Sequence, residues 1–290
     1  MTGAASSRSL FDAHHHLWQR SGTPRPGILG EPYLDRDFRW ADFKDAWGHL
    51  DVRGSCLVEA IGEPEEVTLA EETSREDPGL RAMVAFAAVE GSGLGEALEV
   101  LSRHPIVRGV RRSTQTEADP EFILRPEFVA GARLVGTTGF LLELCVRFAQ
   151  IDAVPRLARE CPETVIVVQH LGKPDVSRAP DAGWLDAIDR LAACPNVHVK
   201  VSPVVHTAHD PWFTAESQRP FIQHAVTSLG WDRVVFGSNW PVSKAVTTYP
   251  EWVEIVTAVC EGAGATADEL DALFLANAER LYSGALSARR

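Results

Sequence analysis

The sequence has few cysteines, and none of them is spaced for a metal or redox site. The five are scattered along the chain, their number is odd, and no two form a C-x-x-C pair. Cys56 and Cys145 lie inside apolar runs, where a thiol packs as a small hydrophobic side chain. This usage excludes a disulfide-stapled fold and indicates a reducing compartment, so we expect a cytoplasmic protein.

The sequence also lacks a long apolar segment. The start, Met1 to Ser9, has no apolar stretch of signal-peptide length, and no run approaches the roughly 20 residues that span a bilayer. We therefore expect no membrane partner. Residues 1–8 are expected to form a flexible N-terminus.

An excess of positive charge is missing as well. The chain carries 40 acidic against 28 basic side chains, for a formal net charge of -12. Binding to phosphate backbones needs a positive field, so this balance excludes nucleic acid as a partner. A small acidic substrate is still allowed, because a local basic pocket can form in an acidic protein. Composition does not decide whether the protein forms a homo-oligomer.

What the sequence does contain is a repeating pattern of short apolar runs and helix-length amphipathic segments. The runs expected to form strands are Ser9–His14, Gly54–Ala60, Arg81–Val89, Val107–Arg112, Phe140–Val146, Val165–His170, Asn196–Ser202 and Arg233–Gly237. The segments expected to form helices include Glu65–Glu76, Gly95–Arg103, Ile151–Glu160, Gly183–Ala193 and Pro220–Leu229. Eight such alternations predict a (β/α)8 TIM-type barrel, with residues 1–290 as a single domain. A doubly wound open sheet is the alternative, and no G-x-G-x-x-G opens a helix to support dinucleotide binding.

Two stretches interrupt the repeat. Gln19–Leu50 and Ser113–Pro126 are rich in proline, glycine or polar residues, and we expect them to be long loops over the C-terminal face of the barrel. The chain is expected to close with a helix from Thr266 to Leu281, which begins with a capping box of Thr266 and Glu269.

The clearest candidate for chemistry is the run of three histidines that ends the first predicted strand. Side chains alternate across a strand, so His14 and His16 share one face while His15 points to the other. The carboxyl ends of barrel strands carry the active site. Two imidazoles at this spacing can hold a divalent metal, usually zinc, or bind a substrate oxyanion directly. A structural polar cluster is the alternative interpretation.

Two later strand ends carry further polar groups. His170 closes the sixth predicted strand, before a turn that contains Gly172 and Lys173, and Asn239 follows the eighth in Phe236-Gly-Ser-Asn-Trp-Pro-Val242. A lone histidine is more often structural than catalytic, and a Trp-Pro turn can simply close a barrel. Together with His14 and His16, both positions become candidates for the reaction centre.

These motifs, in this order, resemble those of the amidohydrolase superfamily. The motifs are Asp-x-His-x-His, Val-x-x-His-x-Gly-Lys-Pro, Asn-Val-x-x-Lys-x-Ser (Asn196, Lys200, Ser202) and Phe-Gly-Ser-x-Trp-Pro-Val. More narrowly, the sequence is similar to the branch of lactone hydrolases, which act on fuconolactone, rhamnonolactone or 2-pyrone-4,6-dicarboxylate. The likeness runs from Phe11 to Tyr282.

The resemblance implies a site in which the His-x-His pair, the sixth-strand histidine and an eighth-strand acid surround the reacting carbonyl. It implies His14, His16, His170 and the residue at position 239 as catalytic, with one divalent metal, zinc by preference, held by the three histidines or absent. It also indicates Arg111 as an anchor for a carboxylate or carbonyl group of a small lactone or carboxylate substrate. Further candidates for substrate contact are Glu143, Lys200, His206 and Trp240. Lys200 could instead form a structural ion pair, Trp240 could simply pack, and His206, like His209, could be a solvated loop residue.

Asn239 departs from the family pattern, which has aspartate at this position as the general base. A carboxamide cannot accept a proton from water near neutral pH. Three interpretations follow. Another group is the base, with His170, Glu143 and Glu59 as candidates; or a zinc ion lowers the pKa of its water; or the protein has acquired another reaction or only binds. We favour hydrolysis of a cyclic ester, against a metal-dependent decarboxylase and a non-catalytic small-molecule binder.

Overall fold

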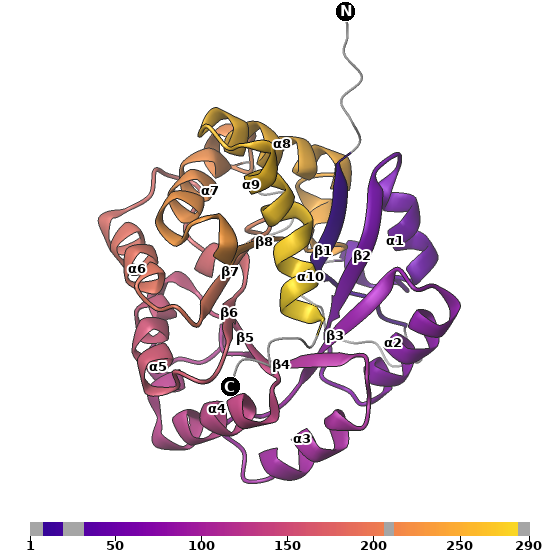
Figure 1. Cartoon of the computed structure of the whole chain (residues 1–290), viewed down its shortest axis with the longest axis vertical. Coiled ribbons are helices and arrows are strands. Elements are labelled where there is room, and N and C mark those ends of the chain that lie inside the picture. Colours follow the sequence, from indigo (N-terminus) through magenta and orange to yellow (C-terminus); the bar gives the residue numbers. More distant parts are fainter. Residues whose placement is uncertain (1–7, 20–31, 206–211, 284–290) are drawn as a thin grey trace, which may run out of the picture.

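Eight parallel strands, paired in chain order, form the centre of the molecule (Figure 1). The computed structural model describes residues 8–19, 32–205 and 212–283. The strands are β1 (Ser9–His15), β2 (Asp51–Val58), β3 (Leu80–Phe86), β4 (Val107–Ser113), β5 (Leu141–Cys145), β6 (Ile166–Val168), β7 (Val197–Val201) and β8 (Val234–Phe236). All eight predicted strands are therefore present, with ends that shift by a few residues.

The sheet closes between its first and last strands. The amide of His16 donates to the carbonyl of Trp240 at 2.7 Å, and the amide of Asn239 donates to the carbonyl of His14 at 2.8 Å. These bonds join the end of β1 to the turn that follows β8. The expected closed barrel is confirmed, and the open sheet is excluded.

Helices surround the barrel (Figure 1). They are α1 (Trp40–Trp47), α2 (Glu65–Glu76), α3 (Leu94–Ser102), α4 (Pro126–Thr138), α5 (Val154–Glu160), α6 (Ala182–Ala192), α7 (Ala215–Leu229), α8 (Tyr249–Gly262), α9 (Ala267–Asp271) and α10 (Asn277–Tyr282). The helix α7 begins five residues before the predicted Pro220, because Thr214 caps it through the amide of Ser217.

The prediction of one long loop from Gln19 to Leu50 is wrong in its second half. Residues 20–31 lie outside the described part of the chain, but α1 follows, after a 3-10 turn at Pro32–Leu34. Its Phe43 is fully buried and stacks on the ring of His15, with ring centroids 4.0 Å apart. This helix is short and forms against a barrel side chain, so its own periodicity did not reveal it.

The predicted closing helix is present, but in three parts. Thr266 and Glu269 form the expected capping box, and α9, a π-helical turn (Ala272–Ala276) and α10 follow without a break in the chain. The helix α10 lies across one end of the barrel (Figure 1). Its Tyr282 stacks on Phe11 in the amino-terminal half of β1, so it covers the end of the barrel opposite to His16.

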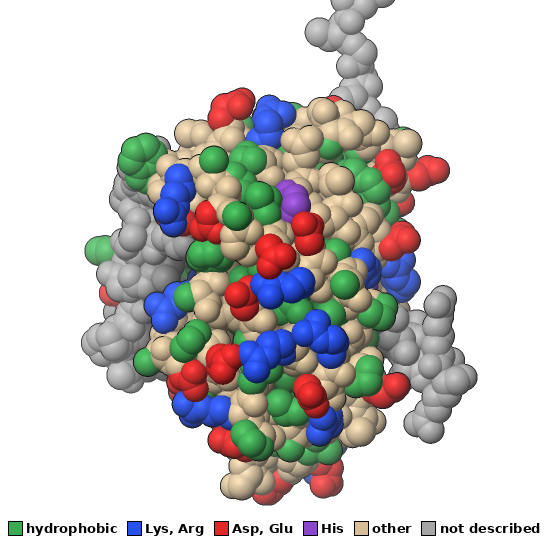
Figure 2. All heavy atoms as spheres, turned by 90° about the vertical axis from the view of Figure 1, so that its left-hand side faces the viewer, with side chains coloured by type: hydrophobic (Ala, Val, Ile, Leu, Met, Phe, Trp, Pro, Cys, Tyr) green, Lys and Arg blue, Asp and Glu red, His purple; other side chains and the backbone are tan. Residues whose placement is uncertain are grey.

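On the face shown in Figure 2, acidic and basic side chains are intermingled and no continuous basic area appears. Arg190, for example, pairs with Asp152 and Asp186. Within residues 8–19, 32–205 and 212–283, no helix has both the length and the apolar character to cross a bilayer.

Candidate active site

A cavity of about 710 Å³ opens at the carboxyl ends of the strands. Four of the predicted site residues line it: His16, Arg111, His170 and Asn239. The second predicted loop contributes Ser113, Gln115 and Thr116 to its wall. Strand ends therefore bring together residues more than 200 positions apart, at the face where barrels of this kind have their active sites.

His14 and His16 point to the same side of β1, as strand alternation predicts. Their Nε2 atoms lie 3.1 Å apart. His16 Nδ1 donates to the carbonyl of Val58 at 2.8 Å, which leaves Nε2 of His16 as an acceptor. His15 points the other way, with its Nε2 3.1 Å from Ser55 Oγ.

The two turns that carry His170 and Asn239 have unusual backbone geometry. In the described residues, a positive φ at a non-glycine residue occurs at His170 (52°), Leu171 (55°), Lys173 (51°) and Asn239 (53°) and at no other place. Residues other than glycine rarely adopt this backbone conformation, and such backbone strain is more frequent at functional sites. The backbone thus marks the same two turns that the motifs indicated.

One buried carboxylate ties the first strand to the eighth-strand turn. Asp12 Oδ1 accepts the amide of His14 at 3.0 Å and the amide of Ser238 at 2.9 Å. Burial raises the pKa of Asp12 to about 6. Because Asp12 Oδ1 accepts both amides, it couples the position of His14 to the position of the turn that carries Asn239.

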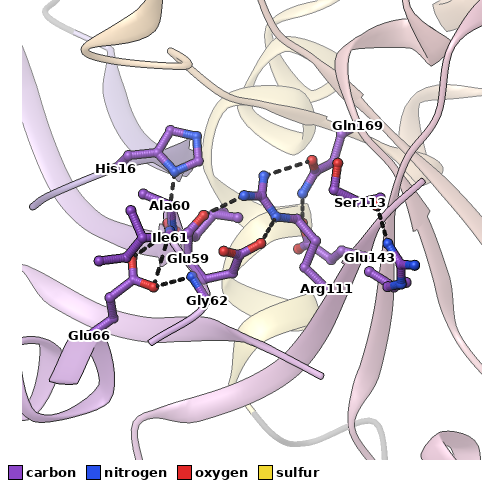
Figure 3. A network of polar contacts seen from close by, with 12 residues as sticks. His16, Glu59, Ala60, Ile61, Gly62, Glu66, Arg111, Ser113, Glu143 and Gln169 are labelled. Atoms are coloured by element: carbon purple, nitrogen blue, oxygen red, sulfur yellow. Dashed lines mark hydrogen bonds and ion pairs between the residues drawn. The ribbon is translucent and has the colours of Figure 1, made fainter. Parts of the chain in front are cut away.

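Arg111 is buried at the cavity wall, and most of its donors are already used (Figure 3). Its Nε donates to Glu59 Oε1 at 2.5 Å, one Nη to the carbonyl of Glu59, and the other to Gln169 Oε1 at 3.3 Å. A guanidinium has five N–H groups, so about two are left for a ligand. With 8% of its surface exposed, Arg111 is not a surface side chain.

Glu143 and Lys200 do not line the cavity. Both are fully buried, and Lys200 Nζ donates to Glu143 Oε2 at 2.6 Å. Glu143 also accepts from Tyr282 Oη at 2.6 Å and from Gln169 Nε2 at 2.7 Å. The pair therefore lies behind the cavity wall, where a base would not meet water.

The other two candidates for substrate contact lie elsewhere. Trp240 is buried against Phe38 and Phe43 and does not line the cavity. His206, with His209, falls outside the described residues. Gln169 was missed by the sequence analysis, although it immediately precedes His170 in the motif.

The imidazoles of the site are kept neutral by their surroundings. Burial, and then the Lys200 ammonium, hold the pKa of His14 well below its usual value. Burial and Arg111 lower the pKa of His16 to about 3, and burial and Lys173 lower that of His170. The same burial lowers the pKa of His15 on the outer face of β1. At neutral pH all four side chains are uncharged.

These four shifts predict a protein that is sensitive to acid. The pKa values of these histidines in the folded protein lie below the unfolded value near 6.5. Their contribution to the free energy of unfolding is therefore fully present above pH 6.5 and is lost as the pH falls toward the folded-state values. Each histidine contributes up to about 1.4 kcal/mol per pH unit, whereas Asp12 and Glu66, whose pKa values are raised to about 6 and about 7, oppose the loss. His198, whose pKa burial lowers to about 4, adds a fifth such group, so we expect the free energy of unfolding to fall by roughly 5–7 kcal/mol between pH 7 and pH 5.

Urea unfolding at a series of pH values measures this dependence. His15→Phe removes one of these groups without touching the cavity, and should reduce the slope between pH 6 and pH 5 by about 1.4 kcal/mol per unit. A slope that does not change in this variant would contradict the assignment of His15 as a buried neutral base.

The fold and the cavity define a class of protein: polar side chains gather at the carboxyl ends of the strands of a parallel barrel, where barrel enzymes have their active sites. The chain belongs to the amidohydrolase family, whose model matches residues 11–284. It is 27% identical to an L-fucono-1,5-lactonase of Burkholderia ambifaria over 237 residues, 81% of either chain. These matches confirm the resemblance to amidohydrolases and to their lactone-hydrolase branch.

Solved structures of other proteins share the fold of this chain. A zinc-bound amidohydrolase from Burkholderia multivorans superposes with a TM-score of 0.84 at 25% identity, over 94% of this chain and 99% of that one. A putative 2-pyrone-4,6-dicarboxylic acid hydrolase from Pseudomonas putida shares the fold, with a TM-score of 0.74 at 21% identity, over 95% and 97% of the two chains.

Metal binding is general in this family, but the donors here do not suit a divalent cation. Lys200 Nζ lies 3.5 Å from His14 Nδ1 and can only donate, so His14 carries its proton on Nε2, directed at His16 Nε2. Asn239 is uncharged, and in the described part of the chain no three His, Cys, Asp or Glu side chains are arranged to hold a metal. The cations that line the cavity are Arg111, which is paired with Glu59, and Lys173.

Proposed function

We propose that this chain hydrolyses the ring ester of a small lactone, with a sugar-acid lactone as substrate and a dicarboxylic lactone as the second candidate. The observation that carries the proposal is the convergence of neutral His16 and His170 with Arg111 on one cavity at the strand ends. The volume of that cavity is in the range of small-molecule sites. The named lactonase relative supports a lactone as the substrate.

Attack of water on the lactone carbonyl puts negative charge on the carbonyl oxygen. The remaining N–H groups of Arg111 are the donors that would stabilise this charge. Because Glu59 and Gln169 hold the guanidinium in place, little reorganisation is needed when the charge develops.

His170 is the base in this proposal. Its Nδ1 lies 2.8 Å from Ser202 Oγ, and with the proton on Nδ1 its Nε2 is free to accept a proton from water. As the ring C–O bond breaks, His170 would return that proton to the ring oxygen, which leaves as the hydroxyl group of the opened hydroxy acid. Asn239 would orient that water, since an amide can donate and accept a hydrogen bond but does not take the proton. Glu59 is committed to Arg111, and Glu143 is separated from the cavity.

A panel of sugar lactones and pyrone dicarboxylates, followed by acid release with and without a chelator, tests the proposal. We expect hydrolysis of at least one sugar-acid lactone, at a rate that neither chelator nor added zinc changes. Carbon dioxide release without lactone consumption would identify a decarboxylase, and a thermal shift without turnover a binder. Activity that is lost with chelator and restored by zinc would overturn the metal-free mechanism.

A further inference from the structure

The segment from Val58 to Glu63, at the end of β2, forms hydrogen bonds with two of the proposed site residues, His16 and Arg111. The carbonyl of Val58 accepts from His16 Nδ1, and Glu59 accepts from Arg111 with both its carbonyl and its carboxylate. The inner side of this segment therefore fixes the tautomer of His16 and the orientation of the Arg111 guanidinium. Ala60 in the same segment lines the cavity itself.

The outer side of the same segment is held by a single carboxylate. Glu66, in the first turn of α2, accepts the backbone amides of Ala60 at 2.6 Å, Gly62 at 2.9 Å and Glu63 at 3.2 Å, and that of Ile61 at 3.3 Å (Figure 3). A carboxylate at the start of a helix usually accepts from its own helix. Glu66 reaches backward instead and gathers four consecutive amides of the preceding loop.

Glu66 is buried, with 4% of its surface exposed, and does not line the cavity. It therefore cannot act on a bound ligand directly. Without it, these four consecutive amides would have to find other acceptors, because an unmet amide is costly. The loop would then move to satisfy them, and the carbonyls on its inner side would move with it.

We propose that Glu66 is a positioning residue for the reaction centre. By fixing the backbone of residues 60–63, it keeps Val58 and Glu59 where they hold His16 and Arg111. The effect passes through the backbone of one short segment, so a residue outside the barrel controls the geometry of the donors inside it.

Hydrogen exchange of the full-length protein tests the backbone part of this proposal, and it needs no substrate. In Glu66→Gln one of the two acceptor oxygens is replaced by a carboxamide NH2 group, which can only donate, and we expect the amides of residues 60–63 to exchange about tenfold faster or more. The matched control is Glu65→Gln, which makes the same charge change at the exposed neighbouring position of the same helix. Amides of β6 report on global opening and should stay at the wild-type rate in both variants.

Steady-state kinetics test the catalytic part, which rests on the proposed lactonase activity. Glu66→Gln should raise KM about tenfold with a smaller fall in kcat, because Arg111 would lose its alignment for substrate. Glu65→Gln should match the wild type. Glu66→Asp, which keeps the charge but shortens the reach, should recover part of both the exchange protection and the KM.

Three results would overturn the proposal. One is exchange at residues 60–63 that is unchanged in both Glu66 variants. Another is faster exchange there that is matched in β6, which would mean only a loss of global stability. The third is faster local exchange with wild-type kinetics. If the wild type hydrolyses no lactone, the proposed function fails, while the exchange experiment still decides whether Glu66 holds the segment.

Discussion

Replacing His170 with glutamine is expected to lower kcat for the lactone substrate by about 10²- to 10⁴-fold, the usual contribution of a general base. Glutamine can still hydrogen-bond to Ser202, so the turn should keep its shape. It cannot take a proton from water, and Asn239 cannot replace it, because both side chains end in a carboxamide. KM should change much less than kcat, since the loss lies in the transition state.

His49→Gln is the control for this experiment. His49 is exposed, and the substitution makes the same chemical change away from the cavity. Initial rates of the two variants and of the wild type, measured at the same pH with unfolding midpoints alongside, separate catalysis from stability. Wild-type kcat in His170→Gln would remove His170 as the base, and the test would then pass to Glu59.

Replacing Lys200 with methionine is expected to reduce the free energy of unfolding by about 3–5 kcal/mol. The Lys200 and Glu143 side chains are both fully buried, and their ion pair is 2.6 Å long. Once the ammonium is removed, the Glu143 carboxylate keeps only the neutral donors Tyr282 and Gln169 to compensate its charge. An uncompensated charge inside the barrel costs more than the lost pair itself contributes.

The double variant Lys200→Met with Glu143→Gln tests this reasoning. It removes both charges while position 143 can still accept from Tyr282 and Gln169, so it should regain most of the lost stability. Urea unfolding of the two single variants and the double variant gives the coupling energy directly. Additive losses would mean that the two side chains act independently and that the buried pair is not a unit.

Much of the fold followed from the sequence because a barrel repeats one local pattern. Val165–Val168 is apolar at consecutive positions, as a strand covered on both faces must be, and β6 lies there. The helix α2 begins and ends where its periodicity predicted. The helix α1 was not predicted, because Phe43 is ordered by contact with His15 and not by its neighbours in sequence.

For the site, the sequence by itself determined the places at which polar groups end the strands. Alternation put His14 and His16 on one face, and closure of the barrel brought His170 and Asn239 to the same cavity. These positions depend on local periodicity and on the number of strands, both of which can be read along the chain.

Only the tertiary structure decided what those groups can do. It separated Glu143 and Lys200 from the cavity as a buried pair, placed Lys200 Nζ 3.5 Å from His14 Nδ1, and joined Arg111 to Glu59. These outcomes depend on which side chains of different strands meet inside the barrel. They also depend on distances of a few ångströms between side chains that are far apart in the sequence. Coulomb interactions and hydrogen bonds change sharply over such distances, and no pattern along one chain records them.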